Sequence, residues 1–269
     1  MRTLAVAQTV PVRGDVAANV AQHLRLAEVA AREWSQLVVF PELSLTGYEI
    51  GLAHNLAFSA HDPRLAPLRD AAHSLAVTLI VGAPIRLGSQ LFIGAFILSP
   101  DRSVDLYTKH HLGAFPASAS CDGTVPPAEA TVFSPGDRNP LIAIDHTLAA
   151  VAVCADTSHP SHPQRAASLG ATAYLASMFV IPSELEAATA SLAGHAADHT
   201  MVVAFANFGG PTGGLAAAGK SALWSETGEI IAQLPNAGPG VALAEKTDAA
   251  WRGDVVLIDQ VDSRPATPR

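Results

Sequence analysis

The stretch "VAVCADTSHP", Val151 to Pro160, ends an apolar run in a cysteine, and an acidic and then proline-broken segment follows it. A cysteine that only packs in a core usually lies inside such a run, whereas Cys154 lies at its exit. The run itself has the length and composition of a buried strand. Cys154 is therefore predicted to stand where a strand opens into a turn, and this position suggests a chemical role.

Similar apolar runs alternate with helical patterns along the whole chain. In the first helical segment, residues 15–34, Asp15 can cap the helix, and one face carries Val20, Leu24, Ala27, Ala31 and Trp34. Further helices are predicted over residues 63–77, 162–170 and 183–199, and strands over residues 3–9, 36–40, 78–84, 91–100, 103–109, 140–146, 148–154, 172–177, 201–207, 221–225, 228–234, 240–245 and 255–259. The alternation predicts one α/β domain over residues 1–269, with mixed sheets covered by helices and residues from about 260 to 269 as a tail.

Composition excludes several classes of protein. The chain has a mass of 27.8 kDa, 49% hydrophobic residues and a formal net charge of -8, without a run of five like charges. We therefore expect neither a nucleic-acid partner nor an anionic membrane partner, and no apolar stretch approaches the ~20 residues of a membrane span. The opening "MRTLAVAQTVPV" is better explained as a strand than as a signal peptide. Cys121 and Cys154 make a poor disulfide framework, which favours the reducing cytoplasm.

Three more ionisable residues stand at comparable positions. Glu42 follows Pro41 at the end of a buried strand, Lys109 ends another strand, and Glu129 lies in the long irregular loop from residue 117 to 130. Taken alone, each has an ordinary explanation: Glu42 as a carboxylate in a helix cap or solvated turn, Lys109 as a solvated lysine at a sheet edge, and Glu129 as a surface glutamate. A thiol, however, needs a nearby base or cation to become a nucleophile, and ligands of α/β sheets bind beyond strand ends.

The segments "VVFPELSLTGYE", "LYTKHHL" and "VAVCADTSHP", in this order, resemble the three signature blocks of the nitrilase superfamily of carbon-nitrogen hydrolases. The glutamate of "EATVFSPG" matches the second catalytic carboxylate of that family. The resemblance implies a four-layer α-β-β-α sandwich that pairs into a homodimer or larger assembly. It also implies that Glu42 is the general base, Lys109 the cation that stabilises the tetrahedral intermediate, Glu129 the second carboxylate and Cys154 the nucleophile, without metal or organic cofactor.

The chemistry implied is hydrolysis of a small linear amide through a thioester. The backbone N–H of Ala155 would assist Lys109 in holding the oxyanion. Ala155 and Asp156 stand where true nitrilases usually carry Trp-Glu, and this difference favours an amide over a nitrile. A carbamoyl-amine hydrolase or an acyltransferase could use the same site. Phe115, Met178 and Phe179 are candidate walls of the substrate pocket, although core packing is at least as good an explanation for each.

Other motifs leave alternatives open. Gly214, Gly219, Lys220 and Ser221 match a phosphate loop literally, but a strand rather than a helix is predicted to follow them. The pairs His195–His199 and His159–His162 have no convincing third metal ligand. A Cys-His hydrolase, with His110, His111 or His159 as the base, and a non-catalytic interaction protein are the remaining alternatives. Cys121 is expected to be a bystander.

Overall fold

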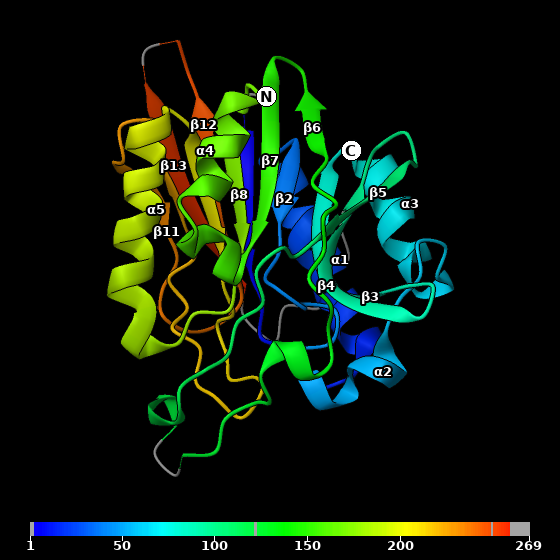
Figure 1. Cartoon of the computed structure of the whole chain (residues 1–269). Helices are drawn as coiled ribbons and strands as arrows, with labels where there is room; N and C mark the ends of the chain where they lie inside the picture. Colours follow the sequence, from blue (N-terminus) through cyan, green and yellow to red (C-terminus); the bar gives the residue numbers. More distant parts are fainter. Residues whose placement is uncertain (1–2, 121–122, 249, 259–269) are drawn as a thin grey trace.

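Two β-sheets lie face to face, and helices cover the outer face of each (Figure 1). The computed structural model describes residues 3–120, 123–248 and 250–258. Cys121 and the predicted tail lie outside these residues. The predicted four-layer α-β-β-α sandwich with two mixed sheets is confirmed.

The first sheet has seven strands in the order β13-β12-β1-β2-β3-β4-β5. Its centre is parallel, since β2 pairs in parallel with β1 and with β3, whereas the outer pairs are antiparallel. The strands are β1 (Thr3–Gln8), β2 (Leu37–Val39), β3 (Thr78–Leu87), β4 (Gln90–Leu98), β5 (Val104–Thr108), β12 (Gly240–Lys246) and β13 (Trp251–Leu257).

The second sheet has six strands in the order β11-β10-β9-β8-β7-β6. It repeats the same plan, because β7, β8 and β9 are parallel neighbours and the outer pairs are antiparallel. The strands are β6 (Leu141–Ile144), β7 (Thr147–Val153), β8 (Ala173–Ser177), β9 (Val202–Ala206), β10 (Ala222–Trp224) and β11 (Ile230–Gln233).

Helices α1 and α3 pack on the seven-stranded sheet, and α4 and α5 pack on the six-stranded sheet (Figure 1). The α-helices are α1 (Val16–Arg32), α2 (Ala53–Leu56), α3 (Ala66–Leu75), α4 (Ser161–Ser168) and α5 (Leu185–His199). Helix α1 begins as predicted, because the Asp15 side chain accepts a hydrogen bond from the N–H of Ala18 at 3.0 Å. None of the described helices is long and apolar enough to cross a bilayer.

One residue of the predicted apolar face of α1 is not on that face. The helix ends at Arg32, and Trp34 adopts a left-handed conformation, with φ of 62°. Its side chain is 82% exposed, whereas Val20 and Ala27 of the same predicted face are buried. Helical periodicity cannot be extrapolated past the residue at which the backbone leaves the helix.

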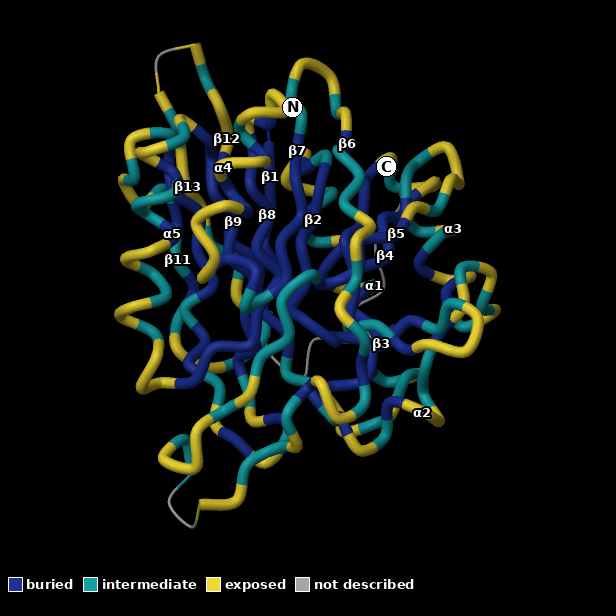
Figure 2. The backbone as a smooth tube through the Cα atoms, viewed as in Figure 1, coloured by how far each residue is buried: buried dark blue, intermediate teal, exposed yellow. Residues whose placement is uncertain are grey.

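The core has three layers, which correspond to the three gaps between the four layers of the sandwich. Between the sheets, residues such as Leu4 and Val39 of one sheet belong to the same cluster as Val151 and Leu175 of the other. The central strands are accordingly buried along most of their length (Figure 2). Side chains of a central strand alternate between two apolar layers, and this is why these strands appear in the sequence as continuous hydrophobic runs.

Candidate active site

The parallel strands at the centre of both sheets leave the core near one another. The Ser177 hydroxyl, at the end of β8, donates a hydrogen bond to the carbonyl oxygen of Phe40, which follows β2, at 2.8 Å. This bond joins the exits of two strands that belong to different sheets. Because β8 is the parallel neighbour of β7, the residues that follow β2 and β7 are thereby brought into one region.

Glu42 is fully buried directly after this exit from β2. One carboxylate oxygen, Oε1, accepts a hydrogen bond from Lys109 Nζ at 2.7 Å. The other oxygen, Oε2, is buried and has no hydrogen-bond partner among the described residues. Burial raises the pKa of Glu42 from 4.5 to about 7. A buried carboxyl with a free oxygen and a pKa near neutrality has the properties of a general base.

The loop that carries Glu42 lies tightly against β3. A Cβ atom at Gly82 would approach the carbonyl oxygen of Pro41 to 2.3 Å and the backbone nitrogen of Leu43 to 2.5 Å. Any side chain at this position of β3 would therefore push the Glu42 loop away. The glycine is needed because of this close approach of two backbones.

Lys109 follows β5 and is also fully buried. Its ammonium donates to Glu42 Oε1 and to Glu129 Oε1, both at 2.7 Å. Burial opposes the charge of Lys109, but the surrounding negative groups outweigh this effect, and the pKa of Lys109 lies above its usual value. Lys109 is thus a permanent cation held by two carboxyl groups.

Glu129 is held in place by three donors. Besides Lys109, the Tyr48 hydroxyl donates to Oε1 at 2.7 Å, and the N–H of Gly113 donates to Oε2 at 2.7 Å. Burial, together with the nearby carboxylates, raises the pKa of Tyr48 well above its usual value, so that the hydroxyl stays a donor. The sequence reasoning missed Tyr48, although it lies six residues after Glu42 in the same signature segment. These three hydrogen bonds leave the Glu129 carboxylate little freedom to move.

Cys154 begins a short 3-10 turn, Cys154–Ser158, directly after β7. Its φ is 45°, a left-handed conformation that is strained for a residue with a side chain. The Sγ atom lies 3.7 Å from the carbonyl oxygen of Phe179. Burial and the negative charge of Glu42 raise the pKa of the Cys154 thiol above its usual value. The thiol is therefore protonated at rest, and its attack on a carbonyl would require simultaneous transfer of its proton to a base.

Asp156, two residues after the cysteine, is a further buried group that sequence reasoning passed over. Its Oδ1 accepts from the backbone N–H groups of His110 and His111, at 3.1 and 2.8 Å. Its Oδ2 accepts from the N–H of Val153 at 3.2 Å and from the Tyr107 hydroxyl at 2.6 Å. One carboxylate thus ties the backbone beside Lys109 to the backbone beside Cys154.

A cavity of about 360 Å³ opens above the thiol. Its lining includes Tyr48, Glu129 and Cys154, as well as Ala155 and all three predicted wall residues, Phe115, Met178 and Phe179. The ring of Phe179 lies 5.2 Å from that of Phe115 and 5.0 Å from that of Tyr48. Met178 and Phe179 are almost completely buried, so they serve the core as well as the cavity wall. A larger cavity elsewhere, around Trp34 and Asp254, is remote from this chemistry.

The histidines near the turn have partners other than the thiol. His111 Nδ1 lies 2.9 Å from Asp156 Oδ1, and the His159 ring stacks on the His111 ring at 3.7 Å. His162 lies between the Tyr107 and Tyr174 hydroxyls, and burial lowers its pKa to about 4. Within the described ranges, no three His, Cys, Asp or Glu side chains are arranged to hold a metal ion. These contacts favour Glu42 over histidine as the base for Cys154.

The segment that matches a phosphate loop has a different structure. Ser221 leads into strand β10 and not into a helix, so no helix N-terminus faces the loop. Its N–H and hydroxyl both donate to Gln8 Oε1, at 3.2 and 3.0 Å. Gly219 serves tight packing, since a Cβ at this position would lie 2.2 Å from the carbonyl oxygen of Asn236.

Solved structures of other proteins share this fold. An amidase from Nesterenkonia sp. AN1, in a mutant form with the acetamide moiety of fluoroacetamide bound to its active-site cysteine, superposes with a TM-score of 0.81 and 24% identity. The superposition covers 92% of this chain and 91% of the amidase. Another mutant of the same amidase, in complex with butyramide, gives a TM-score of 0.79 at 23% identity and covers 91% of this chain and 90% of the amidase.

Curated proteins are similar over part of their length. The glutamine-dependent NAD(+) synthetase of Mycobacterium bovis is 27% identical over 246 residues, which cover 85% of this chain and 36% of the synthetase. The aliphatic nitrilase of Sinorhizobium fredii is 28% identical over 116 residues, which cover 36% of this chain and 38% of the nitrilase. The chain thus spans little more than a third of the length of these relatives.

The family profile described as "Carbon-nitrogen hydrolase" matches residues 3–252, nearly the whole chain. This match includes strands from β1 to β12 and all three strand exits that carry the buried ionisable groups. The protein belongs to the carbon-nitrogen hydrolase family, the nitrilase superfamily.

Proposed function

We propose that the protein is an amidase that hydrolyses a small linear amide through a thioester on Cys154. The observation that carries this proposal is that Glu42 and Glu129 both bind the Lys109 ammonium, that all three groups act electrostatically on the Cys154 thiol, and that Glu129 and Cys154 line one cavity. The names of the relatives support it, because the structural relative is an amidase and the curated synthetase depends on glutamine, which carries a side-chain amide.

In the proposed first step, the thiol proton passes to Glu42 Oε2 while Sγ forms a bond to the amide carbon. The carbonyl oxygen becomes an oxyanion beside the Lys109 ammonium and the N–H of Ala155. Ala155 is the second residue of the 3-10 turn, so its N–H lies among the donors that a turn leaves without an internal partner. Losing one such oxyanion donor typically costs roughly 3 kcal/mol of transition-state stabilisation.

In the next steps, the C–N bond breaks and Glu42 returns its proton to the leaving nitrogen, which departs as ammonia or an amine. A thioester remains on Cys154. Water then adds to the thioester carbon as its proton passes to Glu42, the C–S bond breaks as Glu42 returns this proton to Sγ, and the acid leaves. Glu129 keeps Lys109 charged and in position throughout. No step requires a group that the chain does not supply.

The test is ammonia release from a panel of linear amides by the wild-type protein and by Cys154→Ala. We expect hydrolysis by the wild type and none above background by the variant, with an acyl group trapped on Cys154 in the mass spectrum of the wild type. Including hydroxylamine as a competing acceptor and a carbamoyl amine as a substrate distinguishes acyl transfer and carbamoyl hydrolysis from simple amide hydrolysis. Normal ammonia release from Cys154→Ala would refute the proposal.

A further inference from the structure

The wall of the cavity carries one carboxylate that the proposed chemistry does not use, Glu184. It lies immediately before α5, on the same cavity wall as Ala187, Ala188 and Ser191. Its side chain makes no helix-capping hydrogen bond. Among the described residues, no salt bridge or side-chain hydrogen bond engages the Glu184 carboxylate, in contrast to Glu129, which lines the same cavity and accepts from three donors.

Glu184 is an exposed residue, but the surrounding protein removes part of the water from its carboxylate. Partial burial alone raises the pKa of Glu184, and no neighbouring cation opposes this effect. A carboxylate in such a position gains most from a cation that enters the cavity with a ligand. The geometric observation is that Glu184 and Cys154 line the same cavity.

The remaining lining determines which chemical groups a ligand in the cavity would contact. Phe115, Phe179 and Ala188 provide apolar surface, and Ser158 and Ser191 add neutral hydroxyls. The lining includes no Lys or Arg side chain. The buried group below it contains two carboxyl groups, Glu42 and Glu129, for the single ammonium of Lys109. The described residues of the site therefore carry more negative than positive groups. They offer no free cation that could bind an anionic substrate.

From this arrangement we propose that the preferred substrate is an amide with a cationic amino group at its far end, and that Glu184 binds that ammonium. This inference rests on the proposed amidase function and adds the substrate class. The amide would lie at Cys154, the methylene chain against the aromatic wall, and the ammonium at Glu184. Glu184 would act in binding only, since the proposed reaction at Cys154 uses Glu42 as its base and needs no further carboxylate near the reacting atoms.

The experiment compares matched series of amides that differ only in the terminal group. At each chain length, an ω-amino amide such as 4-aminobutanamide is compared with its neutral isostere, here pentanamide, and with its anionic counterpart, glutaramate. We expect the wild type to prefer the cationic member by about tenfold in kcat/KM at the optimal length, the order expected for one partly exposed charge-assisted contact. The anionic member should be the poorest substrate.

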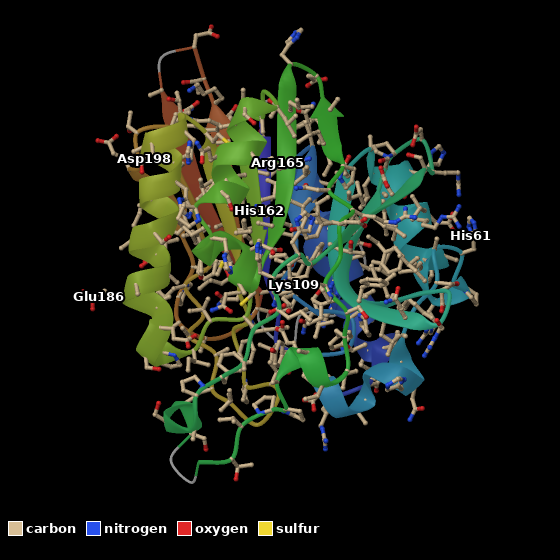
Figure 3. The ribbon with its side chains drawn as sticks, in the orientation of Figure 1. His61, Lys109, His162, Arg165, Glu186 and Asp198 are labelled. Carbon is tan, nitrogen blue, oxygen red and sulfur yellow. The ribbon has the colours of Figure 1, made fainter. Side chains whose placement is uncertain are left out.

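Two variants locate the preference. In Glu184→Gln the cationic substrate should lose about tenfold in kcat/KM, mainly through KM, while the neutral isostere is unaffected. Glu186→Gln is the matched control, because Glu186 lies two residues further on, in the first turn of α5, but projects outward from the molecule (Figure 3), and it should leave both substrates unchanged. A structural role of Glu184 would instead change both substrates equally.

The outcomes separate this inference from the proposed function. If the wild type hydrolyses neutral amides but prefers no cationic member at any length, or if the preference survives in Glu184→Gln, the inference is wrong and the amidase function stands. If no member of any series is hydrolysed, the proposed function itself fails.

Discussion

At the scale of single residues, the site depends on two opposite effects of burial. Burial raises the pKa of Glu42 and of the Cys154 thiol, so that neither is charged as readily as in water. Lys109, equally buried, keeps its charge because two carboxyl groups bind it directly. Transfer of the thiol proton to Glu42 would leave a negative charge on the sulfur. The transfer is therefore favourable only when an amide carbonyl is present, because the charge then moves to the carbonyl oxygen.

The pKa of Glu42 predicts a pH dependence. Glu42 must be deprotonated to accept the thiol proton, and its pKa in the folded protein is about 7 rather than 4.5. With a neutral amide as substrate, kcat/KM should therefore fall about tenfold per pH unit below pH 7 and level off above it. A rate profile from pH 5 to 9 measures this limb. A limb centred near pH 4.5 would contradict the role of burial, and Glu42→Gln should abolish the activity at every pH.

At the scale of elements, Asp156 fixes the exits of β5 and β7 relative to each other. Its two oxygens accept hydrogen bonds from backbone groups on both sides, those of His110 and His111 beside Lys109 and that of Val153 beside Cys154. The carboxylate is fully buried, and it also accepts from Tyr107 and lies 2.9 Å from His111 Nδ1. The distance between the ammonium and the sulfur therefore depends on a residue that need not touch the substrate.

Replacing Asp156 by Asn tests this positioning role. The amide keeps the shape but offers one accepting oxygen instead of two, so some of the backbone donors lose their partner. We expect kcat to fall by about a hundredfold, the usual cost of a small misplacement of reacting groups, with KM changed much less. Circular dichroism should show an intact fold. Asp198→Asn, on the outward face of α5 (Figure 3), should retain full activity; equal losses in both variants would contradict the prediction.

At the scale of the whole molecule, the two sheets must keep their relative position for the strand exits to meet. Gln8 at the end of β1 provides a polar connection across the sandwich. Its Nε2 donates to the carbonyl oxygens of Pro235 and Gly238, at 3.1 and 2.9 Å, and its Oε1 accepts from Ser221, which leads into β10. The amide is fully buried, and each of its hydrogen-bonding groups is used.

The predicted homodimer or larger assembly stays a prediction.

Gln8→Ala should destabilise the fold. The change leaves buried donors of Ser221 and buried carbonyl oxygens without partners, so we expect the free energy of unfolding to fall by about 3 kcal/mol. Urea denaturation followed by tryptophan fluorescence measures this difference. Gln90→Ala, at an exposed position of β4, serves as the control and should change the free energy by less than about 0.5 kcal/mol. A similar small effect of Gln8→Ala would show that the amide is not needed to join the sheets.

The sequence by itself determined the α/β class, most of the helices and strands, and the identity of the four candidate catalytic residues. Buried strands in a layered fold must be apolar on both faces, and a polar residue at the end of such a run stands out. The ordered signature segments around Glu42, Lys109 and Cys154 then connected the chain to its family. These signals are local in the chain, and local patterns can be identified without coordinates.

Only the tertiary structure decided which groups meet. Tyr48, Asp156 and Glu184 carry no local signal, because a tyrosine or a carboxylate in a loop is usually solvated. Tyr48 and Asp156 are buried by contacts with residues 81 and about 45 positions away, respectively. The exposed position of Trp34 likewise depends on the backbone leaving the helix at one residue. Desolvation and hydrogen bonding act between neighbours in space, and spatial neighbours are fixed by the packing of the two sheets.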